Sequence, residues 1–252
     1  MKRRQILFAS VGLLLFWQIL SWLINQPILP APAIVLREFF IELPGELGLH
    51  FLYSFYRVLA SMLLSITLAV PAGLVLGQSK TLDRIFSPII YLLYPIPKVV
   101  LIPIILLLFG INDISKILII FLILFFQILV LVRDQAASIR PELVYSVQSL
   151  GAGRRALFLF VYFPASLPAV LTAIRQSIGT AVAVLYIVEL FATQYGLGYY
   201  IYKYGNTLFN YPRMYAGVLT MSLLGLMLYF SADLLHKKLC PWQFAENGDI
   251  KN

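Results

Sequence analysis

The stretch ILIIFLILFFQILVLV, residues Ile117–Val132, carries no charge, and Gln127 is its one polar side chain. A helix that crosses a bilayer needs roughly 17 to 25 predominantly apolar residues, so this stretch is about long enough. The turn Gly110–Asp113 precedes it and Arg133 follows it. The stretch therefore predicts a membrane-spanning helix, and similar apolar runs lie on both sides of it.

The composition of the whole chain agrees with a bilayer as its solvent. Of the 252 residues, 61% are hydrophobic and 12% are charged, whereas soluble domains carry about 25% charged residues. The net charge of +8 would suggest nucleic acid in a soluble protein. Here the basic residues gather at the ends of apolar runs, so membrane topology explains them and no nucleic-acid partner is expected. One cysteine, Cys240, and two separate histidines provide neither a disulfide nor a zinc motif.

The apolar runs predict an all-α integral membrane protein with about six transmembrane helices. The first run lacks a small-x-small cleavage site, so we interpret it as a retained helix and not as a signal peptide. Four prolines interrupt the third run, and breaks of this kind are tolerated where protein or a watery cavity satisfies the freed backbone groups. The expected spans are approximately 6–24, 58–76, 85–109, 117–132, 168–191 and 214–235.

Lysine and arginine placement predicts the orientation. With a cytoplasmic N-terminus, twelve basic residues lie inside and five lie outside or at the outer edge, as the positive-inside rule requires. The C-terminus is then cytoplasmic too. Outside, a short helix near Glu38 and Glu42 would carry both carboxylates on one face. The segment Thr193–Arg213 is expected to be a loop whose tyrosines lie at the outer membrane interface, with an aromatic ligand cage as the alternative.

A cytoplasmic loop at about 133–166 is the longest non-spanning stretch after the second span. It predicts two short helices, Pro141–Leu150 and Arg154–Tyr162, joined by a glycine turn at Gly151–Gly153. Pro141 suits the first turn of a helix, and Pro164 and Pro168 are expected to end the second one. Two short helices bent about a glycine would form a projection that fits a groove on a soluble partner.

This loop resembles the coupling loop, or EAA loop, of binding-protein-dependent ABC importer permeases. Gly151 and Leu167-Pro168 match that pattern in order and spacing, whereas Tyr145-Ser146-Val147 stands where Glu-Ala-Ala is usual. Further stretches are similar to the nitrate/sulfonate/taurine-type subfamily. They are Tyr94–Pro103, Leu106–Ile117, Leu171–Arg175 and Tyr195–Tyr200.

The resemblance implies a type I ABC importer permease fold, with residues 1–252 forming one transmembrane permease domain. A peripheral N-terminal helix (about 6–24) would precede core spans (about 55–235) and the coupling loop. The implied partners are two ATPase subunits, a second permease subunit (identical or a close paralogue), an extracytoplasmic solute-binding protein and the bilayer of a bacterial or archaeal plasma membrane. ATP and magnesium would bind the ATPase, because this chain lacks a Gly-x-x-x-x-Gly-Lys-Ser/Thr phosphate loop and binds no cofactor itself. The residues expected at the ATPase contact are Tyr145, Ser149, Leu150, Gly151, Ala152, Arg154, Arg155 and Phe158.

Ionisable residues within spans are costly and point to function by default. We place Lys98, Arg175 and Glu189, together with Pro95 and Pro97, along the translocation pathway. Lys98 would attract an anionic solute or bind a carbonyl freed by the prolines. Arg175 could instead extend to the cytoplasmic interface, and Asp233 is expected to meet water or Lys237.

The predicted function is transport and not catalysis. The solute is expected to be a small anion, a sulfonate-like compound or a vitamin precursor. An ion-coupled secondary transporter is the alternative, but the halves show no repeat and no acid lies near a midplane. A membrane-embedded enzyme would need clustered His, Asp or Glu residues at the membrane face, which the sequence lacks.

Overall fold

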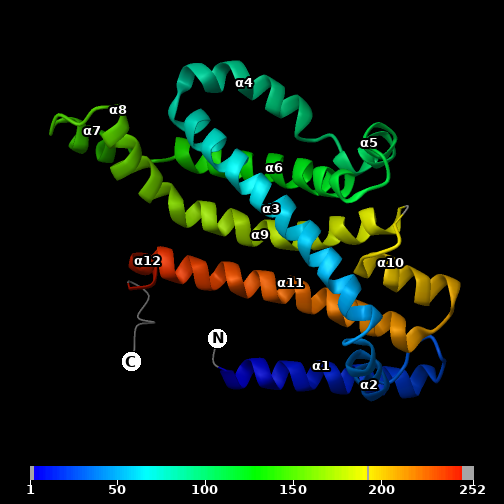
Figure 1. Ribbon diagram of the computed structural model, residues 1–252. Coiled ribbons are helices and arrows are strands. Elements are labelled where there is room, and N and C mark those ends of the chain that lie inside the picture. The colour runs from blue at the N-terminus through cyan, green and yellow to red at the C-terminus, as the bar shows by residue number, and fades with distance from the viewer. Residues whose placement is uncertain (1–2, 192, 246–252) are drawn as a thin grey trace. The chain divides into compact units, whose positions relative to one another are not determined.

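The computed structural model describes residues 3–191 and 193–245, without the side chains of residues 3, 4, 6, 7, 154, 244 and 245. Within that part, every regular element is a helix (Figure 1). The chain divides into two compact units. The first contains Met1–Phe55 and Glu189–Leu224, and the second contains Tyr56–Val188 and Gly225–Asn252. The long helices α3 (Glu46–Gln78), α9 (Phe163–Leu190) and α11 (Tyr211–Leu239) contribute residues to both units.

The first unit combines the chain start with a helical segment that follows α9. Besides the ends of the long helices it holds α1 (Arg3–Ile24), α2 (Pro32–Glu42), α10 (Leu197–Tyr202) and the π-helix η3 (Lys203–Thr207). The expected short helix near Glu38 and Glu42 is thus present as α2. The expectation of a loop from Thr193 to Arg213 was wrong for its central part. Most of α10 is buried, so tertiary packing stabilises a helix too short for its apolar period to be recognised.

The second unit contains the interrupted span. Helix α4 (Lys80–Leu93) is followed by the 3-10 turn η1 (Lys98–Leu101) and by α5 (Ile102–Phe109). The segment formed by η1 and α5 is bent by 75° relative to α4. Pro95 and Pro97 lie at the bend, where the missing N–H groups prevent a continuous helix. The expected break in the third span is confirmed. Helix α6 (Asp113–Ala137) follows after Asn112, whose side chain accepts a hydrogen bond from the Ser115 backbone N–H at 3.0 Å.

Close packing between α3 and α6 depends on two glycines of α3, one turn apart. A Cβ at Gly73 would lie 2.9 Å from the Cβ of Val132, and one at Gly77 would lie 2.5 Å from the Arg133 carbonyl oxygen. Small residues at this spacing allow membrane helices to approach closely. The helices therefore form a tightly packed pair within the second unit.

The segment expected as the coupling loop forms α7 (Pro141–Gln148), a turn, α8 (Arg154–Leu157) and the π-helical turn η2 (Phe158–Tyr162). The prediction that Pro164 and Pro168 end the second short helix was wrong, because the helix continues into α9. The π turn shifts the hydrogen-bond register, with the Phe163 N–H bonding to the Phe158 carbonyl. Pro164 lies just after this turn, and the helix continues past it into α9. Pro168 removes one hydrogen bond without ending the helix.

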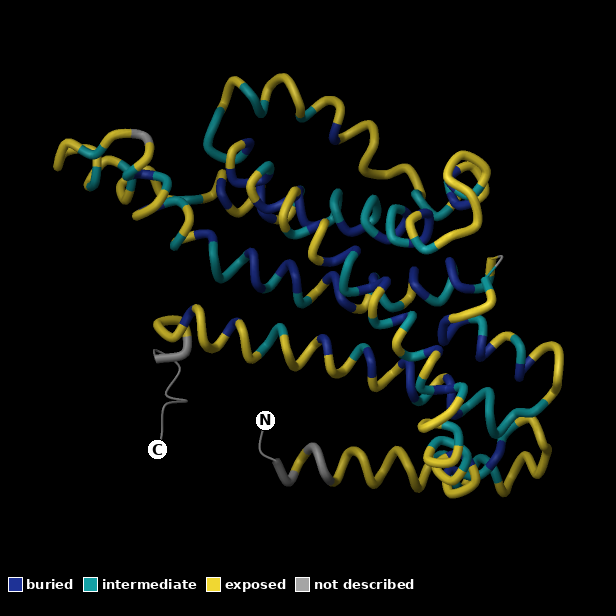
Figure 2. Tube along the Cα trace, viewed as in Figure 1, coloured by how far each residue is buried: buried dark blue, intermediate teal, exposed yellow. Residues whose placement is uncertain are grey.

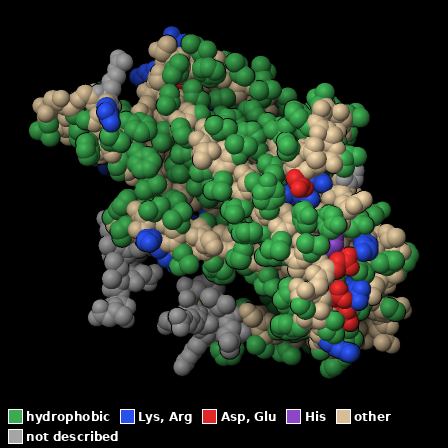
Figure 3. All heavy atoms as spheres, in the orientation of Figure 1, with side chains coloured by type: hydrophobic (Ala, Val, Ile, Leu, Met, Phe, Trp, Pro, Cys, Tyr) green, Lys and Arg blue, Asp and Glu red, His purple; other side chains and the backbone are tan. Residues whose placement is uncertain are grey.

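Among the residues that the structure describes, four helices are long and apolar enough to cross a membrane, and the bent pair α4–α5 makes five if it is one span. Helix α1 adds a shorter apolar stretch, Phe8–Ile24. The six expected spans therefore all correspond to apolar helices, although α3 begins at Glu46 and not near Val58. Figure 2 shows that α1 is largely exposed, and Figure 3 shows a face covered mainly by hydrophobic side chains with a few charged clusters. Exposed apolar surface of this extent suits contact with lipid.

Candidate functional site

The first candidate site is the projecting turn between α7 and α8. Gly151 adopts φ of +81°, a left-handed conformation that favours glycine, and its N–H bonds to the Gln148 carbonyl at 2.9 Å. The prediction of a glycine turn here is confirmed. No residue of α7 is buried. Tyr145 and Leu150 are 66% and 85% exposed, which places apolar side chains at the tip of the projection.

The remaining residues expected at this site surround the turn. Ser149 is exposed and its hydroxyl donates to the Ser146 carbonyl, Ala152 is half-buried, and Arg155 is exposed. The side chain of Arg154 lies outside the described part of the structure. Phe158 is half-buried and its ring contacts that of Phe163, with 6.5 Å between the centroids. The projection thus packs against the protein at Phe158, and its tip is exposed.

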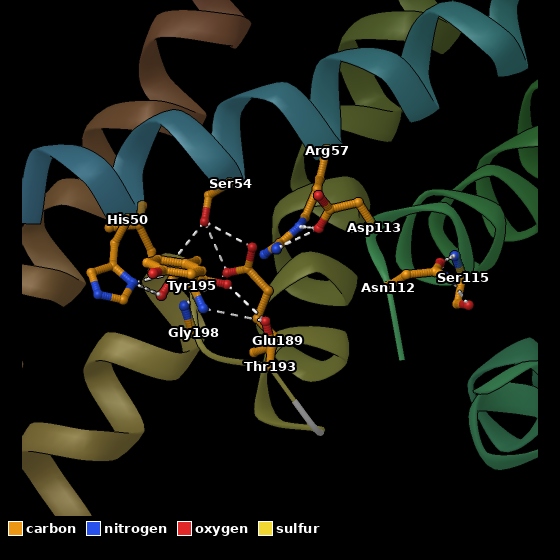
Figure 4. A network of polar contacts seen from close by, with 12 residues as sticks. His50, Ser54, Arg57, Asn112, Asp113, Ser115, Glu189, Thr193, Tyr195 and Gly198 are labelled. Carbon is orange, nitrogen blue, oxygen red and sulfur yellow. Dashed lines mark hydrogen bonds and ion pairs between the residues drawn. The ribbon is translucent and has the colours of Figure 1, made fainter. Parts of the chain in front are cut away.

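The second candidate site, in the first unit, surrounds Glu189, which is fully buried. The Ser54 hydroxyl lies 2.9 Å from both carboxylate oxygens, and the Gly198 N–H donates to Oε2 at 2.9 Å (Figure 4). The Leu197 N–H donates to the Ser54 oxygen at 2.7 Å, and the Gly196 N–H donates to His50 Nδ1 at 2.9 Å. Side chains of α3 and α9 therefore bind the backbone N–H groups at the start of α10, which have no partner within that helix.

A row of three acidic side chains continues this network along the first unit. Glu46 accepts hydrogen bonds from Lys203 and from the Tyr204 hydroxyl, both at 2.6 Å. The hydrogen bond that Lys203 donates to Glu46 holds the pKa of the Lys203 ammonium above its usual value. Arg213 binds Glu42 at 2.6 Å and approaches Glu38 to 3.7 Å, so both α2 carboxylates reach one guanidinium.

Two tyrosines expected at the outer interface are buried in the same network. Tyr200 is fully buried and Tyr204 is 4% exposed, and their rings lie 4.5 Å apart. Burial raises the pKa of both hydroxyls. For these two residues the expectation of a membrane-interface position was wrong, because α10 and η3 pack inward.

Lys98 lies at the bend of the second unit. Its ammonium donates to the carbonyls of Leu93 and Tyr94 at 2.7 and 2.6 Å, and it lies 4.7 Å from the centroid of the Phe126 ring. Both carbonyls belong to the end of α4, just before Pro95 and Pro97. Of the two roles predicted for Lys98, this geometry favours the binding of freed carbonyls.

Arg175 and Asp233 form an ion pair that the sequence analysis missed. Their side chains meet at 2.8 Å, and Lys237 lies 2.9 Å from the other Asp233 oxygen. Both helices carry their charge near the expected cytoplasmic end. Arg175 therefore lies beside a carboxylate of α11, so an extended side chain at the interface is not needed to explain it.

A polar row on α3, half-buried at Glu46 and buried from His50 to Ser65, was also missed. It consists of Glu46, His50, Ser54, Arg57, Ser61 and Ser65, at helical spacings of three and four. In the second unit, Arg57 is 2% exposed and binds Asp113 at 2.6 Å, while the Ser61 and Ser65 hydroxyls reach carbonyls of α6. The spacing was visible in the sequence and would have revealed an inward-facing polar stripe. In the described residues, no group of three His, Cys, Asp or Glu side chains could hold a metal ion.

Comparisons with known proteins show which proteins this chain is similar to. The taurine transport system permease protein TauC of Escherichia coli K12 is 29% identical over 92% of this chain and 87% of its own length. The formylaminopyrimidine transport permease protein ThiX of Halalkalibacterium halodurans is 30% identical over 92% of each chain. A solved structure of the MetNI methionine ABC transporter, in an inward-facing conformation, has a TM-score of 0.66 at 19% identity. It covers 74% of this chain and 93% of that one, and this likeness concerns the fold alone.

Family membership follows from the sequence match. Residues 65–240 match the family described as binding-protein-dependent transport system inner membrane component, and this range contains α4, the bend at Lys98, the projecting turn and α9. The expected resemblance, fold class and transport role are confirmed. The chain belongs to this family and is the membrane-spanning permease subunit of an ABC importer.

Proposed function

We propose that the projecting turn between α7 and α8 docks on a separate ATPase subunit. The observation that carries this proposal is the exposed apolar tip, where Leu150 and Tyr145 extend from a segment outside the spans. Large apolar side chains exposed outside the spans suit a protein-binding site. The contact comprises Tyr145, Ser149, Leu150, Gly151, Ala152, Arg154, Arg155 and Phe158.

The complete transporter in this proposal contains two ATPase subunits, a second permease subunit and an extracytoplasmic binding protein. ATP and magnesium bind the ATPase subunits, because the sequence of this chain has no phosphate loop. Residues 1–252 act as one permease domain in the plasma membrane, with α1 at its periphery and both termini in the cytoplasm. Basic residues at the predicted inner ends of the spans support this orientation.

The proposed solute is a small anion, a sulfonate-like compound or a vitamin precursor. The named solutes of two relatives, taurine and formylaminopyrimidine, support this range. Pro95, Pro97, Lys98, Arg175 and Glu189 stay our proposed pathway residues. For Arg175 the proposal is supported by a side chain that remains 24% exposed while it is paired to Asp233.

A glycine pair tests the docking role. At Gly151, a valine would need φ of +81° and should distort the turn, whereas Gly153 has an ordinary backbone and open space for a side chain. We expect Gly151→Val to insert normally, to lose most copurifying ATPase and to lose uptake in vesicles. Gly153→Val is the matched control and should retain both. Equal ATPase recovery from the two variants would show that this turn is not the docking contact.

A reconstitution tests the division of labour. The permease alone, in vesicles loaded with ATP, should accumulate no solute, because it has no nucleotide site. Adding the ATPase and the binding protein should restore uptake. Accumulation by the permease alone would contradict the proposal and would favour a secondary transporter.

A further inference from the structure

An apolar cavity of about 500 Å³, open at the surface, lies in the second unit between α3, α4 and α6. Every residue that lines it is apolar, from Pro71 to Leu76 on α3, from Leu82 to Leu93 on α4, and from Phe125 to Leu129 on α6. Water needs two to four polar partners to occupy a cavity, and this lining offers no polar side chain. The cavity therefore suits an apolar occupant and not ordered water.

The cavity has the length of one bilayer leaflet. On α4, the lining residues Leu82, Phe86, Ile89, Ile90 and Leu93 follow a helical spacing and form one face. Leu82 and Leu93 are separated by about 16 Å along a helix that rises 1.5 Å per residue. Half of a hydrocarbon core of about 30 Å is close to that length. An extended acyl chain fits this space in length and in chemistry.

The two ends of the cavity differ in charge. At the Leu82 end, Lys80 and Arg84 are exposed and lie four residues apart on the first turns of α4. Among the residues that the structure describes, neither takes part in an ion pair, whereas Asp83 between them binds Arg133 at 2.6 Å. At the Leu93 end, the Lys98 ammonium is directed to the Leu93 and Tyr94 carbonyls. Free positive charge is thus concentrated at one mouth.

We propose that this cavity binds one acyl chain of an anionic phospholipid, with the lipid phosphate at Lys80 and Arg84. The acyl chain extends from Leu82 towards Leu93, at the end of α4, and fills the space between α4 and the closely packed pair α3–α6. The lipid thereby supports the interrupted span from within the membrane. This proposal rests on the membrane location of the chain and not on the identity of the transported solute.

The first test measures lipid retained by the purified, assembled transporter. Native mass spectrometry and lipid extraction should find about one phospholipid per permease copy, with phosphatidylglycerol preferred to phosphatidylcholine on exchange. Ala72→Trp fills the cavity from α3 and should reduce retention at least several-fold. Leu63→Trp, at an exposed position of α3 that does not line the cavity, is the matched control and should retain the lipid. Equal retention by both variants would overturn the proposal.

A second test needs no substitution. Phosphatidylglycerol with a photoreactive diazirine in mid-chain is reconstituted with the wild-type transporter, and labelled peptides are mapped. Labelling should concentrate on residues 71–93 and 125–129, and Lys80→Gln with Arg84→Gln should weaken it for phosphatidylglycerol but not for phosphatidylcholine. Absence of lipid labelling there, or cross-links from these residues to a neighbouring subunit, would assign the cavity to a protein contact and reject the proposal. Neither readout uses transport, so the proposal can fail while the proposed function stands.

Discussion

Two interrupted helical segments are held by opposite charges. At the bend after α4, the Lys98 ammonium binds the Leu93 and Tyr94 carbonyls, just before the prolines that interrupt the helix. At the start of α10, the Glu189 carboxylate binds the Gly198 N–H. A cation thus serves the end of one helix and an anion serves the beginning of another, as the helix dipole favours. An ionisable residue within a span can therefore complete the backbone hydrogen bonding and need not contact solute.

From these two helix ends we expect the largest loss of stability for a substitution at Glu189. Its replacement by alanine leaves the Ser54 hydroxyl and the Gly198 N–H without this acceptor in a buried place, which should cost about 3 kcal/mol. Thermal unfolding of the purified permease should show a clear loss of stability. Glu189→Gln, which keeps an acceptor oxygen, should lose less than Glu189→Ala. Unchanged stability in the alanine variant, together with slow uptake, would instead assign Glu189 to the pathway.

The expected effect at Lys98 is smaller because its ammonium is only half-buried. Lys98→Met should cost about 1 kcal/mol, which discounts the usual value for a charged hydrogen bond for solvent screening. The amount of assembled complex measures this loss, and Lys98→Arg should recover part of it. Full assembly with reduced uptake of an anionic solute would support the pathway role.

The smallest contribution to stability is expected from the ion pair Arg175–Asp233, which binds no backbone group. A double-mutant cycle on Arg175→Ala and Asp233→Ala should give a coupling of about 1 kcal/mol or less, because both side chains remain partly exposed. Lys237→Ala is the control for the competing contact of Asp233. A coupling energy as large as the stability lost in Glu189→Ala would contradict the expectation that charged side chains stabilise the fold more when they bind backbone groups.

The sequence was sufficient for the helical class, the interrupted span and the glycine turn, because each depends on local signals. Long apolar runs, two neighbouring prolines and a glycine between short helices act within a few residues. The start of α3 was missed because His50, Ser54 and Arg57 lower its apolar character, and their burial depends on partners elsewhere in the chain. Arg175 and Asp233 lie 58 residues apart, so only the folded structure shows their contact. Pro164 was misread as a helix end because a π turn is not visible in a residue pattern.

That π turn has a mechanical consequence. Because η2 joins α8 to α9 without a loop, residues Arg155–Leu190 form one helical element of 36 residues, about 54 Å long at 1.5 Å per residue. A flexible loop at this place could move without moving α9, whereas a continuous helix transmits a movement of the projecting turn to α9. Each residue of a helix turns it by about 100°, so the single extra residue in the π turn sets the rotation of α9 relative to α8. Torque applied at the projecting turn must therefore either rotate α9 as a whole or deform the five residues Phe158–Tyr162.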